Sequence, residues 1–386
     1  MSKKKLVQLV VLSSCLAFLI GSCKKDFPPK LCNCNQNDLV VTHSVFATGL
    51  NSPRGLKFGP DGNLYVAEGG IGGTHSTIGQ CEQVPGGPAG PGPETGGPTG
   101  SDIVKINGNG HVSIVADNLP SSQTSPGAGG DVEGVGDIAF INNTLYGVLA
   151  GAGCSHGVPS IPNGIIKVLP NKKWEMIANL SHFQMTNPVA NPNPLDFEPD
   201  GTWYSMINVG SDLYAVEPNH GEIDKIDRSG NISRVVDVSA SQGHIVPTSM
   251  VYHNGNFYFS NLGVFPLSNQ SNVYKLDHNG TISIVASGFT MVTGIAFDQA
   301  GGLYVLESTT NNPFPTPGTG DVVRIDQSGA RITLVTGLTL PTAMTFGPDN
   351  NLYISNWGYG AAPGGGEIWK VNITCSKQNN RQNLKS

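Results

Sequence analysis

The chain has 386 residues, of which 51 are glycine and 27 are proline, and only 13% are charged. This composition is typical of a turn-rich β protein, because glycine and proline adopt or preset the backbone angles of tight turns. The net charge of -6 argues against nucleic acid as a partner, since a phosphate-binding surface needs clustered basic residues and these are scattered after the first few positions.

The first 22 residues have the pattern of a bacterial export signal. Residues 3–5 are lysines, residues 6–20 are apolar but too few to span a bilayer comfortably, and small residues precede Cys23. The arrangement resembles the lipobox of bacterial lipoproteins, which implies cleavage before Cys23 and a lipid on that cysteine. Cleavage before Cys15 and secretion without a lipid are the alternatives. We expect an exported lipoprotein of a bacterial membrane, facing the periplasm or the cell surface.

A flexible tether follows the signal. Residues 23–38 are polar and contain proline, which suits a linker between a lipid and a folded domain. The folded domain is expected over residues 39–375, and residues 376–386 form a polar C-terminal tail.

Six copies of one sequence unit fill this domain. Each copy has an apolar strand A, a tight turn, a strand B with Leu-Tyr or Phe-Tyr, a strand C with a basic residue, and a strand D. The shared tyrosines are Tyr65, Tyr146, Tyr214, Tyr258, Tyr304 and Tyr353. The shared basic residues are Lys105, Lys167, Lys225, Lys275, Arg324 and Lys370. Because both columns recur in every copy, we interpret them as architecture rather than as a site.

Four antiparallel strands in a repeat of roughly 40 to 50 residues are the periodicity of a propeller blade. We therefore predict an all-β, six-bladed β-propeller of the NHL or TolB type. The last copy lacks its strand D, while the segment from Thr42 matches the strand D segment that begins at Ala330. We predict that residues 42–48 complete the last blade and close the ring.

The ring closure and the loop positions suggest two disulfides in an exported protein. Cys375 follows the last strand C, and Cys32 and Cys34 precede the N-terminal strand that should pair with it. We predict a bridge from Cys375 to Cys32 or Cys34. Cys81 and Cys154 lie in corresponding B–C loops of neighbouring blades, which predicts a second bridge.

The B–C and D–A connections should lie on one face of the ring, which we take as the binding face because it carries the long loops. At the end of strand B five blades carry a carboxylate or an amide: Glu68, Glu217, Asn261, Glu307 and Asn356. We interpret them, with His244 and the D–A residues Asp131 and Glu133, as ligand-binding residues around the channel mouth. The alternative for the strand B residues is that they cap turns by bonding backbone amides.

A second acidic run, Asp196, Glu198 and Asp200, resembles the first half of a calcium loop, with oxygen ligands at alternate positions before a glycine. Its twelfth position is Ile207 instead of glutamate, and Glu217 could supply the missing ligand. A Ca²⁺ site is thus one prediction, and a solvated acidic loop is the other. The histidines His75, His156, His220 and His244 map to the same face.

The run from Leu213 to Asp227 looks like an NHL-repeat core, and the wider pattern resembles the ScyD/ScyE family of NHL-type propellers. Residues 66–73 with Cys81 and residues 97–106 carry this likeness, together with the acidic run before blade 3. The resemblance implies the fold but no defined activity.

Two classes of function follow. The first is a monomeric, lipid-anchored module that binds a small molecule, a glycan or a protein on its loop-rich face. The second is an enzyme similar to the metal-dependent lactonases or to quinoprotein sugar dehydrogenases. The lactonase family places acidic or amide ligands at the start of strand A, where this chain has Arg54, Gly136, Tyr204, Thr248, Thr293 and Thr342. That departure favours the binding module.

Overall fold

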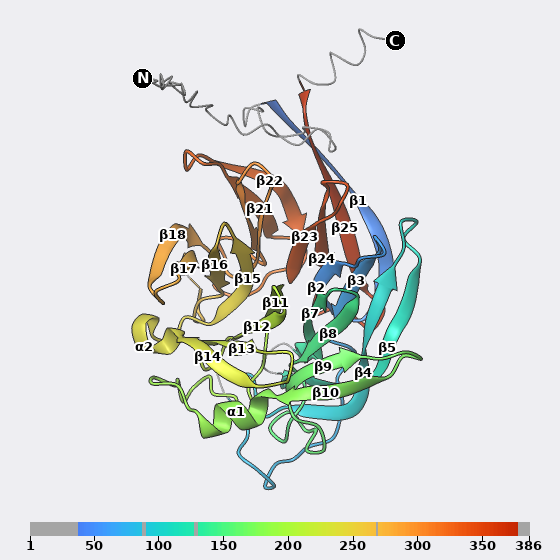
Figure 1. Ribbon diagram of the computed structural model, residues 1–386, viewed down its shortest axis with the longest axis vertical. Coiled ribbons are helices and arrows are strands. Elements are labelled where there is room, and N and C mark those ends of the chain that lie inside the picture. Colours follow the sequence, from blue (N-terminus) through green and yellow to red (C-terminus); the bar gives the residue numbers. More distant parts are fainter. Residues whose placement is uncertain (1–37, 87–89, 127–129, 268, 377–386) are drawn as a thin grey trace, which may run out of the picture.

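The computed structural model describes residues 38–86, 90–126, 130–267 and 269–376. Within them the strands form six antiparallel sheets around a central axis (Figure 1). The predicted six-bladed β-propeller is confirmed. No helix in the described part of the chain is long and apolar enough to cross a membrane.

Blades 1 to 3 carry the additions to the basic four-stranded unit. Blade 1 has five strands: β2 (Pro53–Phe58), β3 (Leu64–Glu68), β4 (Thr95–Ile106), β5 (Val112–Gln123) and β6 (Val132–Glu133). Blade 2 consists of β7 (Val135–Ile141), β8 (Thr144–Leu149), β9 (Gly164–Val168) and β10 (Trp174–Asn179), followed by α1 (Leu180–Thr186). Blade 3 consists of β11 (Ser205–Val209), β12 (Asp212–Glu217), β13 (Glu222–Ile226) and β14 (Ile232–Asp237), followed by α2 (Val238–Gln242).

Blades 4 to 6 are regular four-stranded sheets. Blade 4 consists of β15 (Pro247–His253), β16 (Asn256–Asn261), β17 (Ser271–Leu276) and β18 (Ile282–Phe289). Blade 5 consists of β19 (Val292–Phe297), β20 (Leu303–Glu307), β21 (Gly320–Ile325) and β22 (Arg331–Leu338). Blade 6 consists of β23 (Ala343–Phe346), β24 (Leu352–Asn356), β25 (Gly366–Cys375) and β1 (Leu39–Leu50).

The ring closes through its two ends, as predicted. Strand β1 pairs with β25 from Leu39 opposite Cys375 to Leu50 opposite Gly366. In Figure 1 the two strands run side by side, with the start of β1 next to the end of β25. Cys375 is disulfide-bonded. Its predicted partners, Cys32 and Cys34, lie outside the described residues, as do the signal, Cys23 and the tether.

The tyrosine and basic columns join neighbouring strands and blades. Four of the tyrosines meet a strand A phenylalanine of the next blade edge to face, with ring centroids about 5 Å apart: Tyr65 with Phe140, Tyr258 with Phe297, Tyr304 with Phe346, and Tyr353 with Phe58. Four basic residues pair with an aspartate of the A–B turn: Lys105 with Asp61, Lys225 with Asp212, Arg324 with Asp298, and Lys370 with Asp349. The tyrosine column therefore joins neighbouring blades and the basic column joins strands within one blade, in agreement with the architectural interpretation.

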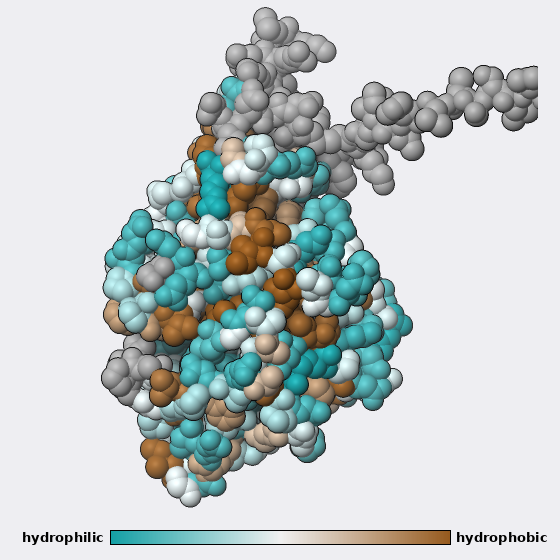
Figure 2. Space-filling view, turned by 90° about the vertical axis from the view of Figure 1, so that its left-hand side faces the viewer, coloured by the Kyte–Doolittle hydropathy of each residue, from teal (hydrophilic) through white to brown (hydrophobic). Residues whose placement is uncertain are grey.

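We call the side with the A–B and C–D turns the turn face, and the side with the B–C and D–A connections the loop face. On the loop face β4 and β5 extend beyond the ring, pairing as far as Thr95 with Gln123. The outer surface seen in Figure 2 is mostly hydrophilic, with hydrophobic side chains gathered toward its middle. The apolar core lies between neighbouring blades. One of its clusters joins Leu56 and Val66 of blade 1 to Tyr353 and Ile368 of blade 6.

Candidate functional site

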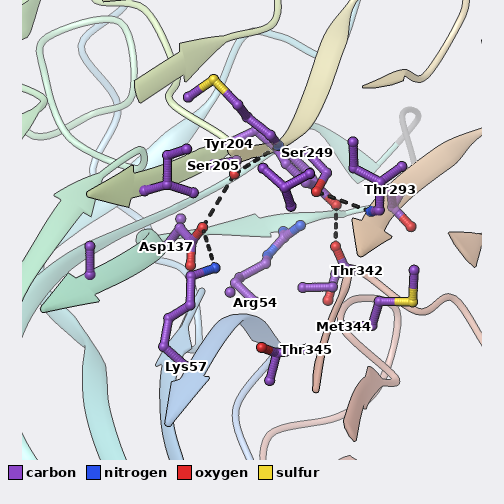
Figure 3. Close-up of a pocket in the computed structure, with 18 of the residues that line it drawn as sticks. Arg54, Lys57, Asp137, Tyr204, Ser205, Ser249, Thr293, Thr342, Met344 and Thr345 are labelled. Atoms are coloured by element: carbon purple, nitrogen blue, oxygen red, sulfur yellow. Dashed lines mark hydrogen bonds and ion pairs between the residues drawn. The ribbon is translucent and has the colours of Figure 1, made fainter. Parts of the chain in front are cut away.

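A cavity of about 540 Å³ follows the axis of the ring. Strand A of every blade contributes to its wall, with Lys57, Asp137, Ser205, Ser249, Ile295 and Thr345 as examples. Figure 3 shows these strands around the cavity, with Arg54 and Lys57 pointing into it. Asn208 and Tyr252 line the cavity and are also exposed, so it reaches solvent at the turn face.

Tyr204 spans the loop-face end of this cavity. It belongs to blade 3, and its hydroxyl donates to the backbone carbonyl of Thr342 in blade 6, on the opposite side of the ring, at 2.7 Å. Arg54 lies nearby and forms an ion pair with Asp131, with Nη2 and Oδ1 2.7 Å apart. Burial raises the pKa of Tyr204, so its hydroxyl remains a hydrogen-bond donor. The cavity is therefore narrowed at its loop-face end.

Asp137 organises the polar wall below Tyr204. Its Oδ2 accepts from the Met206 amide at 2.9 Å and from the Ser205 hydroxyl at 3.3 Å, and it lies 3.3 Å from Lys57 Nζ. The chain makes room for this carboxylate with Gly55, since a Cβ there would come within 1.9 Å of Asp137 Oδ1. The Asp137 carboxylate therefore already has three polar contacts, whereas the Lys57 ammonium group keeps N–H donors that can face the cavity.

A second group of ionisable side chains is buried on the loop face around His156. Its Nδ1 lies 2.8 Å from Glu94 Oε2 and 3.8 Å from Glu133 Oε2. Its Nε2 lies 3.6 Å from Glu198 Oε2 and 3.2 Å from the Gly201 carbonyl oxygen. Glu94 and His156 are fully buried, and the side chain of Glu133 is 17% exposed. We call Glu94, Glu133, His156 and Glu198 the His156 cluster.

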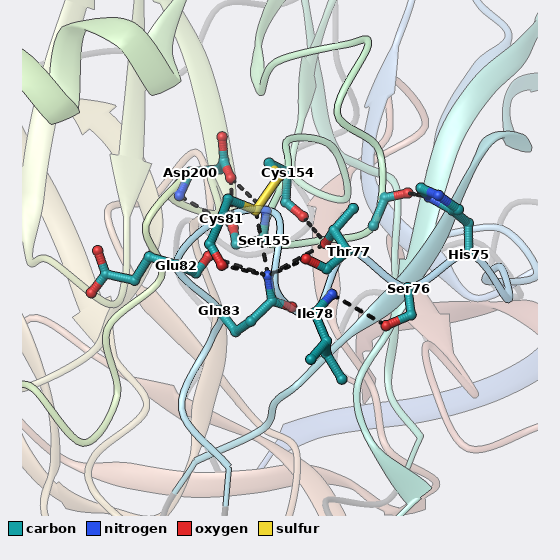
Figure 4. The surroundings of a disulfide bond; sticks show 11 residues. His75, Ser76, Thr77, Ile78, Cys81, Glu82, Gln83, Cys154, Ser155 and Asp200 are labelled. Carbon is teal, nitrogen blue, oxygen red and sulfur yellow. Dashed lines mark hydrogen bonds between the residues drawn. A yellow bond between two sulfur atoms is a disulfide. The ribbon is translucent and has the colours of Figure 1, made fainter.

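The additions to blades 1 to 3 bring this cluster together. Glu94 directly precedes β4, Glu133 lies in β6, and His156 belongs to the B–C loop of blade 2. The predicted disulfide between Cys81 and Cys154 is confirmed and joins the B–C loops of blades 1 and 2 (Figure 4). The amide and hydroxyl of Ser155 both donate to Asp200 at 2.7 Å, which ties the same loop to blade 3.

Burial and mutual charge shift the pKa values in the cluster. Burial alone would lower the pKa of His156, but the charge and hydrogen bond of Glu94 outweigh it and raise the pKa to about 9. Burial, reinforced by the Glu94 charge, raises the pKa of Glu133 to about 8. Burial also raises the pKa of Glu198 well above its usual range. The cluster therefore retains protons that exposed groups of the same kind would lose.

The residues at the end of strand B are engaged with the backbone. Three carboxylates accept from an amide of the connection before strand A: Glu68 from Asn51 at 2.9 Å, Glu217 from Thr202 at 3.1 Å, and Glu307 from Thr290 at 2.5 Å. Asn356 accepts from Thr339 at 2.8 Å, and Asn261 donates to the Ile245 carbonyl oxygen at 2.9 Å. The alternative drawn from the sequence is that these residues cap the B–C turns; the contacts described here instead tie the end of strand B to the D–A connection. Burial raises the pKa of Glu68 and Glu307 to about 8.

The run from Asp196 to Asp200 does not assemble as one calcium loop. Asp196 pairs with His244 at 2.8 Å, Glu198 faces His156, and Asp200 accepts from Ser155. Each of the three side chains thus has a different partner in a neighbouring segment, and the Ca²⁺ site stays a prediction. Glu217, offered as a further ligand, accepts instead from the amides of Thr202 and His220.

Of the predicted ligand residues, the structure brings Glu133 and Glu198 together at His156. Asp131 forms an ion pair with Arg54, and His244 Nε2 contacts Asp196 Oδ2 at 2.8 Å. Sequence reasoning missed Glu94, Lys57 and Asp137. Glu94 sits in an irregular Gly- and Pro-rich loop with no motif around it, whereas Lys57 and Asp137 could have been found as charged residues in otherwise apolar strands A.

No known protein family and no curated protein matches the chain. Solved structures do match. The PQQ-bound aldose sugar dehydrogenase of Streptomyces coelicolor has a TM-score of 0.53 at 12% identity, over 87% of this chain and 98% of that one. A gluconolactonase of Xanthomonas campestris has a TM-score of 0.53 at 9% identity, over 86% and 90%. An auxiliary nutrient binding protein of Bacteroides thetaiotaomicron has a TM-score of 0.52 at 10% identity, over 87% and 77%. At such identities the similarity establishes the fold, a six-bladed β-propeller of the gluconolactonase type.

Proposed function

We propose that the protein is an exported binding protein, anchored through a lipid on Cys23, that holds a small polar ligand in its axial cavity. The cavity itself carries the proposal. Its volume of about 540 Å³ lies in the range of small-molecule sites, and it combines a few polar groups with apolar walls. Membership of the ScyD/ScyE family, suggested by the sequence motifs, is part of the same proposal.

The wall indicates the chemistry of the ligand. Lys57 offers a positive charge, while Asn208, Ser249 and Thr345 offer hydrogen-bonding groups. Phenylalanine rings at the end of strand A, such as Phe58 and Phe140, supply apolar surface near the turn face. A small polyhydroxylated molecule that carries a carboxylate, as sugar acids do, would satisfy both kinds of surface.

The residues present do not fit the axial metal of a lactonase. At the strand A starts, Thr248, Thr293 and Thr342 donate their hydroxyls to backbone carbonyls of the next blade at 2.7, 3.0 and 2.6 Å. Arg54 has no atom suited to bind a cation, and its guanidinium is ion-paired with Asp131. The remaining two starts are Gly136, which has no ligand atom, and Tyr204, whose hydroxyl is already donated.

A quinone cofactor that bears several carboxylates does not fit either. The loop-face end of the axis is surrounded by acidic side chains, among them Asp131, Glu133 and Glu198. The nearby Arg54 is already neutralised by Asp131. Where these carboxylates are ionised, their charge opposes a cofactor with several carboxylates at this end of the cavity, whereas a sugar acid would place its single carboxylate at Lys57. The binding function is therefore better supported than either enzyme.

The position of the tether bears on how the ligand arrives. Strand β1 begins at Leu39, opposite the end of strand C, and hence on the turn face where the cavity opens. A tether over residues 23–38 would extend at most about 55 Å at ~3.5 Å per residue. The cavity mouth would then face the membrane side, and the loop face would point outward.

A ligand screen tests this function. The mature protein is heated with a panel of sugars, sugar acids and neutral polyols, and the shift in melting temperature is measured, followed by titration calorimetry of the hits. We expect a sugar acid to bind, with at least a tenfold loss of affinity in Lys57→Met and in Thr345→Trp, which fills the cavity. Thr336→Trp, on an exposed outer strand, is the matched control and should bind normally.

Two results would count against the proposal. One is binding that survives both cavity variants, which would move the site elsewhere. The other is turnover: hydrolysis of a sugar lactone, or sugar oxidation after incubation with quinone and Ca²⁺, would assign the protein to an enzyme class.

A further inference from the structure

The His156 cluster has the features of a metal site. It lies next to the loop-face end of the axial cavity and is distinct from the place proposed for the sugar acid. Its potential donor atoms in Glu94, Glu133 and His156 all lie within 4.8 Å of one another. They come from three segments far apart in the sequence, held together by the extended β4–β5 hairpin, by β6 and by the loop disulfide. A set of donors fixed by covalent and hydrogen-bonded supports is preorganised.

Two buried carboxylate oxygens in the cluster indicate that a ligand binds there. Glu94 is fully buried, and while its Oε2 contacts His156, its Oε1 has no hydrogen-bond partner among the described residues. Glu198 Oε2, also buried, has no hydrogen-bond partner there either and only the 3.6 Å contact with His156 Nε2. A buried carboxylate oxygen without a partner is costly, and buried charges are normally paired or bound to a metal.

The charges in the cluster agree with this. Three carboxylates, from Glu94, Glu133 and Glu198, surround one imidazole. Arg54, whose charge also acts on Glu133, is ion-paired with Asp131. When ionised, these carboxylates outnumber the single imidazole, and a divalent cation would balance their charge.

The orientation of the imidazole leaves one nitrogen for a metal. With a metal bound, Nε2 would donate to the Gly201 carbonyl oxygen, which lies 3.2 Å away, and the Nδ1 lone pair would face the metal between Glu94 and Glu133. Metal-binding histidines commonly donate their other ring nitrogen to a backbone carbonyl or a carboxylate in this way. Glu198 lies on the Nε2 side and would support the ring without binding the metal.

The donor set selects the metal. One imidazole nitrogen with carboxylate oxygens suits zinc, whereas calcium is bound by oxygen atoms alone. We propose that Glu94 and Glu133, through one carboxylate oxygen each, and His156, through Nδ1, bind one Zn²⁺ ion on the loop face. Because Glu133 also lines the axial cavity, this ion lies in the cavity wall at its loop-face end.

Titration calorimetry of the metal-free mature protein with ZnCl₂, MnCl₂ and CaCl₂ tests the proposal. We expect one zinc ion per chain, with an affinity at least tenfold above that for manganese and a hundredfold above that for calcium. Glu94→Gln and His156→Gln should each weaken zinc binding at least a hundredfold. The matched controls are Glu82→Gln, in the same blade 1 loop, and His111→Gln, on the turn face; both residues are exposed, and both variants should bind as the wild type does.

A second measurement does not depend on the variants folding. Crystals of the wild-type protein grown with zinc should show an anomalous peak at the zinc edge between Glu94, Glu133 and His156. A peak elsewhere, no saturable zinc binding, or zinc binding unchanged in both ligand variants would each overturn the proposal. None of these results depends on whether the axial cavity binds a sugar acid.

Discussion

The two halves of the ring use the same strand positions differently. In blades 4 to 6 the residue before or at the start of strand A is a threonine, and each threonine donates its hydroxyl to the next blade: Thr248 to Val292, Thr293 to Pro341, and Thr342 to Pro53. In blades 1 to 3 the same position holds Arg54, Gly136 and Tyr204. Blades 4 to 6, the regular half, are thus joined by a repeated hydrogen bond. In blades 1 to 3, the irregular half, the residues at these positions do not make this hydrogen bond.

The irregular half is held by individual contacts instead. Arg54 pairs with Asp131, and Gly136 leaves room for the Trp203 carbonyl oxygen, which a Cβ would approach within 2.2 Å. Tyr204 reaches across the axis to Thr342. The disulfide joins the two long loops above. The half that departs from the repeat is therefore the half that carries Lys57 and Asp137 of the cavity wall and the His156 cluster.

The largest effect should come from removing the loop disulfide. Cys81 and Cys154 are 73 residues apart, so Cys81→Ala with Cys154→Ala should lower the free energy of unfolding by about 4 kcal/mol. Denaturant unfolding under oxidising conditions measures this. A loss below about 1 kcal/mol would show that the loops are held without the disulfide, and the contrast between the halves would weaken.

The next largest effect concerns Asp137. Asp137→Ala removes a buried carboxylate and leaves the Met206 amide and Lys57 without their partner, which should cost about 3 kcal/mol. The matched control is Asp61→Ala, since Asp61 is exposed and its ion pair with Lys105 should contribute less than about 1 kcal/mol. Equal losses in the two variants would contradict the role assigned to Asp137.

A smaller effect is expected in the regular half. Thr248→Val keeps the shape of the side chain but removes its donation to Val292, for a loss of about 1 to 2 kcal/mol in the free energy of unfolding. Thr336→Val, at an exposed position, should change stability by less than about 0.5 kcal/mol. If Thr248→Val were neutral, the threonines would not hold the ring.

The last effect is a change in the pH dependence of stability. Burial raises the pKa of Glu68 to about 8 from an ordinary 4.5, so the folded protein keeps a proton that the unfolded chain releases. Stability should therefore be greatest near and below pH 4.5 as far as this group is concerned, and fall as the pH rises toward 8. Glu68→Gln should flatten the melting temperature between pH 5 and pH 8, and Glu82→Gln should not. Parallel curves for wild type and Glu68→Gln would show that Glu68 does not titrate in this range.

The fold was predictable because it repeats. The tyrosine column marked six blades, the match between Thr42 and Ala330 identified the closing strand, and the loop positions of Cys81 and Cys154 predicted their bridge. Each of these predictions compares corresponding positions in several copies of the repeat. Structural neighbours agree at the level of the fold.

The candidate sites were less predictable because they depend on what is not repeated. Glu94 and His156 are 62 residues apart in two irregular loops, and only the disulfide and the extended hairpin bring them together. The strand B carboxylates drew attention by recurring, yet in blades 1, 3 and 5 each of them accepts from an amide of the connection before strand A. In this ring, recurrence marks architecture, and the departures from it mark the candidate sites.

The most direct measurement is a crystal structure of the mature protein with the best ligand from the sugar-acid screen. We predict electron density for the ligand in the axial cavity, within hydrogen-bonding distance of Lys57 and Ser249. Density on the loop face, with none in the axial cavity, would contradict the assignment.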